Sequence, residues 1–563
     1  MHIESTIIHN VFYDSLVLMQ LNTALLKYPG VEQAVVMMGT HENKGTIKDA
    51  RLITEEVRRA TPNDLFIVVR GEDAQLCAEA IQFARQQLEH GPERASRAAV
   101  TYRTLEAAVR NTPAANLVSI SLPGQYAGAE ARRALEAGLH VFLFSDNVPM
   151  EQEIELKKLA AEKRRIVMGP DCGTAIVGGA ALGFANAVRR GDIGVAGAAG
   201  TGIQEITSLI HRLGGGITHA IGTGGRDVKA EIGARTLIGG VQWLAQDPDT
   251  RVIVIVSKPG SASAVKRLSE IVAHCGKPVV INFLGASAGE FSSQNVVHTR
   301  TLEDAAVAAV ALAGDQPADT LRVRLADAGY LNALMEEERA RLQSGQRFFR
   351  GLFSGGTLAN ESAMLLLEHL EGIHGNVSLP GVAPLDDPWQ SVGHTCVDMG
   401  EDVFTVGKPH PMLAPNLRRD RLLQEAADPA TGVIFLDLVL GYGVHPDPAG
   451  EFANYIQEAK AIARRAGRRL PVVVNVCGVD EDPQNRASQV EVLRQSGALV
   501  APTNASATRL AIGILTGKYH TPDGEDIRPP SDATSPLTLA PAEAPPFDLP
   551  RQANVINMGL IPF

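Results

Sequence analysis

The feature that most constrains this chain is a repeated unit of a short apolar strand, a glycine-rich turn and an amphipathic helix. The unit recurs from about residue 115 to about residue 518. Apolar strands rich in Val and Ile and joined by helices are typical of parallel sheets that helices cover on both faces. The crossover connections are expected to be right-handed. The chain is therefore predicted to be an α/β protein.

The pattern of apolar residues also predicts the individual elements. Strands are predicted at 33–38, 64–69, 117–121, 140–144, 165–169, 193–197, 219–222, 251–256, 278–283, 351–353, 433–440, 471–476 and 498–502. Helices are predicted at 73–88, 127–138 and 151–163, and a polar linker helix is predicted at 335–347.

The 563 residues divide into several blocks, as expected for domains of about 150 residues. We predict a small α+β domain over 1–95, a Rossmann-like domain over 96–190, an α/β domain over 191–316, a helical linker over 317–348, a second α/β domain over 349–518 and a Pro-rich tail over 519–563. The tail is interpreted as an extended tether. Its apolar end, residues 555–563, fits a docking element and a frayed terminus equally well.

Charge and cysteine content exclude several classes of protein. The net charge of −11 argues against a broad surface for nucleic acid or for an anionic membrane. The five cysteines form no CxxC pair, which argues against zinc and against a disulfide framework. The N-terminus lacks the pattern of a signal peptide, and no apolar run is long enough to span a membrane. We therefore expect a cytoplasmic protein without a metal or a bound cofactor.

Two glycine turns are candidate phosphate sites. One begins at Gly194 and reads GVAGAAGTGIQE, and the other begins at Gly351 and reads GLFSGGTLANE. Each leads from a strand into a helix, whose free N–H groups and dipole favour an anion. The predicted phosphate-binding residues are Ala199, Gly200, Thr201, Gly202, Gly355, Gly356 and Thr357.

Three other turns carry reactive side chains. In GPDCGTAI (169–176), Cys172 is a candidate nucleophile, but a small buried residue is the preferred interpretation because no base is adjacent in sequence. In GTGGRD (222–227), Arg226 could bind a carboxylate or phosphate, or could pair with Asp227; we favour the ligand. In VGKPHPM, Lys408 and His410 lie among prolines, where His410 could polarise a carbonyl or could be an exposed loop histidine.

Several of these motifs resemble a known family. IVMGPDCGTAI, GAAGTGIQE and THAIGTGGRD resemble the α subunit of succinyl-CoA synthetase and other NDP-forming acyl-CoA synthetases. SGGTLANE resembles the matching loop of that family's β subunit. The resemblance covers about 115–315 and 350–518, and it implies a Rossmann-like CoA-binding-type domain followed by two flavodoxin-like synthetase-type domains. In the synthetases, the two helix starts face each other around a phosphohistidine.

Over nearly its whole length, the chain is similar to the FdrA family. The similar motifs are MMGTHENK, TPNDLFI, FSDNVPMEQEIELK, MGPDCGT, THAIGTGGRD and FTVGKPHPM. This resemblance implies a subunit of a carbamoyltransferase of allantoin breakdown and purine catabolism. With two partner proteins, such a subunit interconverts oxalurate plus phosphate with oxamate plus carbamoyl phosphate. A homo-oligomer is also compatible with the sequence.

Three departures from the synthetases distinguish these functions. The Gly-His-Ala-Gly motif of the phosphohistidine is absent from 281–300, where His298 lacks flanking glycines. In addition, Asp171 replaces the Asn of the synthetases' Gly-Pro-Asn-Cys turn, and no block is left for an ATP-grasp domain. The sequence therefore favours carbamoyl transfer. An acyl-CoA synthetase subunit that uses a partner's ATP-grasp domain is the alternative, and a scaffold that acts through the tail is a third hypothesis.

Under carbamoyl transfer, the two glycine turns bind phosphate. Arg226 neutralises the phosphate or the oxamate carboxylate, and Lys408 or His410 polarises the carbonyl. The predicted substrate-binding residues are Gly224, Gly225, Asp171 and Cys172.

Overall fold

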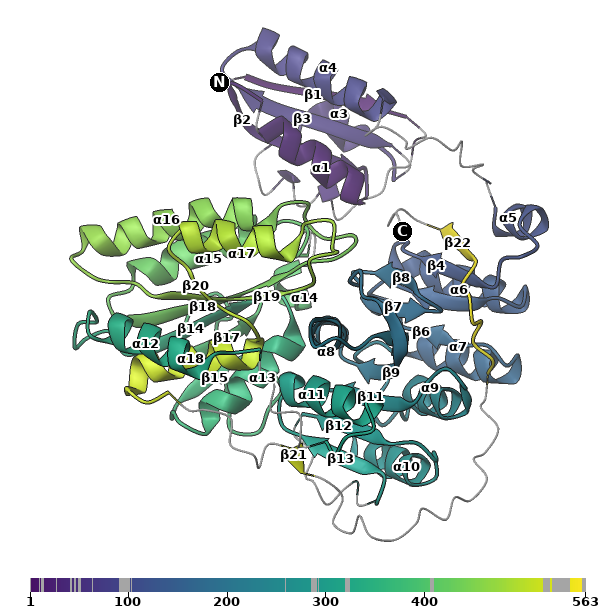
Figure 1. Ribbon diagram of the computed structural model, residues 1–563. Helices are drawn as coiled ribbons and strands as arrows, with labels where there is room; N and C mark the ends of the chain where they lie inside the picture. Colours follow the sequence, from purple (N-terminus) through teal and green to yellow (C-terminus); the bar gives the residue numbers. More distant parts are fainter. Residues whose placement is uncertain are drawn as a thin grey trace. The chain divides into compact units, whose positions relative to one another are not determined.

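The computed structural model describes most of the chain as two compact units (Figure 1). The described residues are 2–9, 11, 15–26, 28–40, 43–44, 47–48, 52–62, 64–90, 102, 104–258, 260–284, 291, 293–318, 325–405, 410–519, 527–528 and 547–558. One unit combines Met1–Arg103 with Phe404–Ala414, and the other combines Thr104–Val403 with Pro415–Phe563. Among the described residues, we find no helix with the length and hydropathy of a membrane span.

The first unit contains an antiparallel sheet of strand order β1-β3-β2. Its elements are β1 (His2–Ile8), α1 (Ser15–Leu26), β2 (Val31–Met38), α3 (Glu55–Arg59), β3 (Leu65–Gly71) and α4 (Ala74–His90). Side chains alternate along the central strand, so Ile67 packs with α1 and α4 while Phe66 packs with Val57 of α3. Both faces of β3 are thus buried, and these elements form a small α+β fold, as predicted. The unit differs from the predicted domain 1–95 because it also contains Phe404–Ala414, from the predicted domain 349–518.

The second unit begins with a parallel sheet of order β22-β4-β5-β6. Its elements are α5 (Leu105–Asn111), β4 (Leu117–Ile120), α6 (Gly124–Glu136), β5 (His140–Leu143), α7 (Met150–Glu162), β6 (Val167–Met168) and β22 (Val555–Met558). The last strand comes from the tail, so part of its apolar end docks on this chain's own sheet. Most of the predicted tether lies outside the described residues.

A second sheet has the order β21-β13-β12-β11-β9-β10-β7-β8. Its elements are β7 (Thr174–Val177), β8 (Ala180–Gly183), β9 (Arg190–Ala198), α8 (Gly200–Arg212), β10 (Ile217–Gly222), α9 (Arg235–Gln246), β11 (Val252–Ser257), α10 (Ala262–Ala273), β12 (Val279–Phe283), β13 (Val296–Thr299), α11 (Leu302–Ala313) and β21 (Ile527–Arg528). The β7–β8 hairpin falls within the predicted domain 96–190 but joins this sheet, because β7 pairs with β10.

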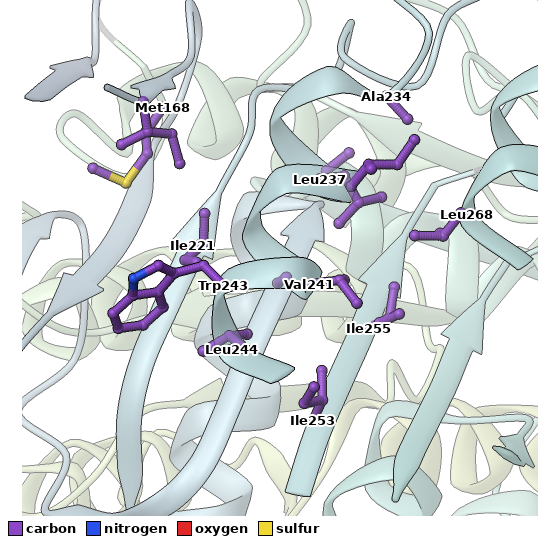
Figure 2. Close-up of a cluster of buried hydrophobic side chains, with 14 of the residues drawn as sticks. Met168, Ile221, Ala234, Leu237, Val241, Trp243, Leu244, Ile253, Ile255 and Leu268 are labelled. Atoms are coloured by element: carbon purple, nitrogen blue, oxygen red, sulfur yellow. The ribbon is translucent and has the colours of Figure 1, made fainter. Parts of the chain in front are cut away.

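Helix α9 illustrates how this second sheet is covered. Leu237, Val241 and Leu244 face Ile253 and Ile255 of the central strand β11 in one buried cluster (Figure 2). These side chains are almost completely buried. Burial of each stabilises the fold by about 1.5–3 kcal/mol. The apolar run 251–256 is therefore a central strand covered by helices, as its sequence predicts.

A third sheet has the order β16-β15-β17-β14-β18-β19-β20. Its elements are α12 (Ala328–Arg339), β14 (Phe348–Phe353), α13 (Gly356–Leu367), β15 (Ile373–Gly375), β16 (Ala383–Pro384), β17 (His394–Asp398), α14 (Asp402–Thr405), α15 (Asn416–Ala427), β18 (Thr431–Val439), α16 (Pro448–Arg465), β19 (Val472–Cys477), α17 (Arg486–Gln495), β20 (Leu499–Ala501) and α18 (Asn504–Thr516). The predicted linker helix 335–347 ends earlier, at Arg339, and α12 packs on α18 through the buried Leu331 and Met335.

The second and third sheets share a layer of helices. Helices α8 and α11 cover one face of the second sheet and contact α13 and α18, which cover the third (Figure 1). Helix α8 is buried from Thr201 to His211, and α18 is buried from Asn504 to Ile514. A helix that is buried on all sides needs partners for each of its polar groups. This layer places the two predicted glycine turns next to each other.

Candidate functional site

The starts of α8 and α13 both leave backbone N–H groups free. Ala199 and Gly355 occupy the N-cap positions, and neither start has a hydrogen bond from a capping side chain in the described part of the chain. By contrast, the nearby helix α11 begins with a capping box at Thr301. An uncapped helix start can donate its N–H groups to an anion.

The two starts lie directly against each other. A Cβ atom on Gly202 would stand 2.8 Å from Cγ2 of Thr357, and a Cβ atom on Gly355 would stand 2.5 Å from Cγ2 of Thr201. Each glycine thus makes room for the threonine of the opposite helix. All the predicted phosphate-binding residues are brought together at this junction. That they bind phosphate remains a prediction.

A buried hydroxyl lies beside the same junction. Thr174 is only 1% exposed, and its Oγ1 lies 4.0 Å from where a Cβ atom on Gly200 would stand. This hydroxyl has no hydrogen-bond partner among the described residues. Because an unpartnered buried hydroxyl is unfavourable, Thr174 is available to donate a hydrogen bond to a water or a ligand oxygen at the start of α8.

Lys258 brings an ammonium group to the junction. It follows the last residue of β11, and its Nζ lies 2.7 Å from where a Cβ atom on Gly356 would stand. Its nearest carboxylate partner is Glu401, at 3.9 Å, and its side chain is 32% exposed. A cation at a helix N-terminus opposes the helix dipole. An anion bound at the junction would interact favourably with both.

Two carboxyl groups near Lys258 can exchange protons close to neutral pH. Asp398, at the end of β17, also contacts the position of a Cβ on Gly356, and burial raises its pKa to about 6 against the attraction of Lys258. Asp171 lies in the turn after Gly169 and Pro170. The residue is exposed, but the chain around its carboxyl group desolvates it and raises the pKa of Asp171 to about 7. Lys258 lowers the pKa of Asp171, whereas Asp146 and Glu401 raise it.

The predicted substrate loops pack against each other. A Cβ atom on Gly224 would collide with the carbonyl oxygen of Pro170, and one on Gly222 would stand 2.6 Å from Sγ of Cys172. Cys172 is 1% exposed, and its burial raises the pKa of the thiol to about 12. A protonated, buried thiol is not a nucleophile at neutral pH, in agreement with the preferred interpretation of Cys172 as a small buried residue. Gly225 faces open space.

Arg226 is held by an ion pair that the sequence did not suggest. Its guanidinium lies 2.9 Å from Glu153 of α7 and donates a hydrogen bond to the carbonyl of Val148. Asp227 instead pairs with Lys157 at 2.7 Å and caps α9. The alternative interpretation, an Arg226–Asp227 pair, is therefore wrong, because α7 supplies ionic partners for both residues. The Arg226 side chain is 27% exposed, and its role toward a ligand remains a prediction.

The two other predicted catalytic residues are Lys408 and His410. Lys408 lies outside the described residues. His410 belongs to the unit that contains residues 1–103, and its Nδ1 accepts a hydrogen bond from the backbone N–H of Met412 at 3.3 Å. Their proposed contribution to the junction of α8 and α13 remains a prediction.

Lys258 and Asp398 are residues that sequence reasoning missed. Lys258 comes just after the predicted strand 251–256, and residues at the carboxyl ends of parallel strands tend to bind ligands, so this position was a usable signal. Asp398 ends a strand with no long apolar run, and its sequence gave no comparable signal.

Comparison with known families agrees with this architecture. A family model described as "CoA binding domain" matches residues 188–285, and one described as "CoA-ligase" matches residues 352–514. A third, described as "AllF, heavy metal-associated domain", matches residues 1–103. The CoA binding domain match, residues 188–285, begins where the predicted Rossmann-like domain 96–190 ends. These matches confirm the predicted α/β fold class, with a CoA-binding domain and a CoA-ligase-like domain after a small N-terminal domain.

The chain is also similar to curated proteins. It is 40% identical over 516 residues to the uncharacterized protein YahF of Escherichia coli, covering 91% of this chain and 98% of YahF. It is 26% identical over 191 residues to subunit α 1 of an ADP-forming succinate–CoA ligase of Archaeoglobus fulgidus. It is 25% identical over 191 residues to subunit SauD of an ADP-forming sulfoacetate-CoA ligase of Bilophila wadsworthia. Each of these two matches covers 33% of this chain and 64% of the ligase subunit.

The residues of the N-terminal unit do not fit the heavy metal in the description of its family model. Residues 1–103 contain one cysteine, Cys77. Its thiol is buried, donates to the carbonyl of His2 at 3.6 Å, and has a pKa raised by burial. A heavy-metal site needs several thiolates or other ligands. Across the described residues, no cluster of His, Cys, Asp and Glu could hold a metal ion.

Proposed function

This chain belongs to the same protein family as Escherichia coli YahF, and we propose that it is a subunit of a group-transfer enzyme of the succinyl-CoA synthetase type. The reaction would form or break a bond between phosphate and a carbonyl carbon. One observation carries this proposal: the uncapped starts of α8 and α13 meet beside the ammonium of Lys258. Since the related ligase chains are named as subunits, partner proteins are part of the proposal.

The groups at the junction suit an acyl phosphate. The N–H groups that begin the two helices would hold the phosphate oxygens, and Lys258 would neutralise their charge. Attack of the CoA thiol on the carbonyl carbon would form a C–S bond and break the bond from carbon to the phosphate oxygen. The thiol proton would pass to a carboxylate, for which Asp171, with a pKa of about 7, is the candidate. The phosphate would leave with the electron pair.

Acyl-CoA ligation is the first candidate, because residues 352–514 match a CoA-ligase model and residues 188–285 match a CoA binding domain model. Carbamoyl transfer is the second, and the absence of the synthetases' histidine motif favours it. His298, the histidine nearest in sequence to that motif's place, lies on β13 with its Nε2 3.0 Å from the carbonyl oxygen of Phe291. Without a phosphohistidine, carbamoyl phosphate itself would supply the phosphate that leaves, and oxamate would be the acceptor.

Both candidate reactions need a phosphate site at the starts of α8 and α13, and binding of inorganic phosphate tests for that site. Calorimetry on the full chain should detect phosphate binding, and Lys258→Ala should weaken it at least tenfold. Lys266→Ala, on the exposed surface of α10, is the matched control and should bind like the wild type. Undetectable phosphate binding by the wild type, or equal binding by Lys258→Ala, would refute the proposal.

Two activity assays then separate the candidates. The chain, purified with its partner proteins, is given acetyl phosphate and CoA, and the loss of free thiol is followed. In parallel, it is given carbamoyl phosphate and oxamate, and phosphate release is followed. Activity in the first assay alone supports ligation, and activity in the second alone supports carbamoyl transfer. In either case, Lys258→Ala should lower the rate by roughly a hundredfold or more.

A further inference from the structure

A cavity of about 780 Å³ lies between the end of α7, strand β6 and helices α9 and α10. None of the residues that begin α8 or α13 lines it. Sites for small organic molecules typically have volumes of about 300–1,000 Å³. This cavity is therefore large enough for a ligand of its own, separate from the phosphate of the proposed function.

Three arginines from three different elements line this cavity: Arg165 before β6, Arg235 at the start of α9 and Arg267 on α10. Within the described residues, none of the three forms an ion pair with a carboxylate. Arg165 donates to the carbonyls of Gly138 and Arg164, and Arg267 donates to that of Gly233. Such hydrogen bonds orient a guanidinium without neutralising its charge.

The other charged groups of the cavity do not cancel these three. Lys157 is already paired with Glu153 at 3.0 Å and with Asp227 at 2.7 Å. Among the described residues that line the cavity, Glu270 is the single acidic one. The cavity is thus locally cationic in a chain of net charge −11. An anion bound in this cavity would be attracted by the three guanidiniums and could accept their hydrogen bonds.

Apolar side chains form another part of the wall. Ile166, Val167 and Ile238 line the cavity together with Phe547, which comes from the tail. They are 2%, 1%, 7% and 3% exposed, respectively. An inorganic anion would make no favourable contact with these apolar side chains. The wall therefore suits a ligand with an apolar or aromatic body as well as a charge.

We propose that this cavity is a binding site for an amphipathic organic anion, in which a phosphate or carboxylate group meets the arginines and an apolar or aromatic body packs on Ile166, Ile238 and Phe547. The proposal concerns a second site, and it holds whatever reaction occurs between α8 and α13.

Calorimetry on the full chain tests the proposal with two probes, ADP and octanoate, which present phosphate and carboxylate groups on different bodies. At least one probe should bind, and the double variant Arg235→Gln/Arg267→Gln should weaken that binding at least tenfold. Adenosine and inorganic phosphate, each lacking half of the proposed ligand, should not compete for the site. Arg464→Gln/Arg465→Gln, on the exposed last turn of α16, is the control and should bind like the wild type.

Either of two results would overturn the proposal: neither probe binds the wild type, or the double variant of the cavity binds as tightly as the control. Arg235 and Arg267 are exposed, so the double variant is expected to fold, and its unfolding temperature verifies this. Which probe binds tells whether the anionic group of the natural ligand is a phosphate or a carboxylate.

Discussion

The carboxylate of Glu361 accepts a hydrogen bond from the backbone N–H of Leu302, 2.7 Å away, and so joins the third sheet's helix α13 to the first turn of α11 on the second sheet. A second hydrogen bond joins α8 of the second sheet to α18 of the third. Glu205 of α8 accepts a hydrogen bond from the backbone N–H of Asn504, 3.2 Å away, in the first turn of α18. Each domain therefore caps a helix of the other.

This exchange lies beside the junction of the proposed phosphate site. Glu205 and Glu361 each stand four residues after the threonine of a helix start, Thr201 and Thr357. The interdomain carboxylates therefore lie about one turn from the two helix starts, and their bonds tie the two domains together beside the junction. Asn504 adds a hydrogen bond from its Nδ2 to Oε2 of Glu361 at 2.8 Å.

The capping by Glu361 predicts a pH-dependent stability. Burial raises its pKa from 4.5 to about 7, against the opposing effect of its hydrogen bonds with Asn504 and Leu302. Below pH 4.5 the group is protonated in both the folded and the unfolded chain. Between pH 4.5 and 7 the unfolded chain releases the proton while the folded chain keeps it. The free energy of unfolding should therefore decrease as pH rises through this range, by up to about 3 kcal/mol.

Glu361→Gln should remove this dependence, because glutamine does not titrate. Urea unfolding of the wild type and the variant at several pH values between 4.5 and 8 measures it. Glu491→Gln, exposed on α17, serves as the control and should keep the wild-type slope. If Glu361→Gln also kept that slope, other groups would be responsible for it.

The facing helix starts predict a compensating pair of substitutions. Gly202→Ala should destabilise the chain by about 1–3 kcal/mol, since its new Cβ atom would stand 2.8 Å from Cγ2 of Thr357. Thr357→Ser removes that methyl group. The double variant should therefore recover part of the lost stability, as measured by chemical unfolding.

Gly345→Ala is the control for this pair, because nothing lies within 4 Å of the new Cβ atom. It should leave stability within about 0.5 kcal/mol of the wild type. Strictly additive effects of Gly202→Ala and Thr357→Ser would mean that the two residues do not touch.

The docked tail predicts a third effect. Phe547 and Leu549 are 3% and 5% exposed within a buried cluster of the second unit. Phe547→Ala should lower the free energy of unfolding by about 3–5 kcal/mol. Tyr126→Ala, at an exposed aromatic side chain of α6, should change it little. Unchanged stability of Phe547→Ala would show that the tail does not dock in solution.

Sequence reasoning succeeded where local patterns determine the structure. The apolar runs became strands, and the glycine turns became uncapped helix starts, because these properties depend on residues close in sequence. It failed where partners come from distant segments. The partner of Arg226 is Glu153, and the neighbour of β4 is a strand beginning at Val555. Lys258 lay at a predicted strand end, but only the packing of α13 brings Gly356 beside it.

The last prediction concerns the proton acceptor of the proposed reaction. If Asp171 accepts the substrate's proton, it must be ionised, so the rate should rise with pH through about 7, where its carboxyl titrates. Asp171→Asn should abolish this rise and lower the rate by roughly 100- to 10,000-fold. The rate of phosphate release is measured from pH 5.5 to 8.5.

Substitutions of two charged residues near Asp171 should shift the pH at which the rate rises, in opposite directions. Asp146 raises the pKa of Asp171 by charge repulsion, so Asp146→Asn should shift the rise to lower pH. Lys258 lowers it by attraction, so Lys258→Ala should shift the rise in its residual activity to higher pH. A general loss of structure would lower the rate at every pH without these opposite shifts. A rise that stays at the same pH in both variants would exclude Asp171 as the titrating group.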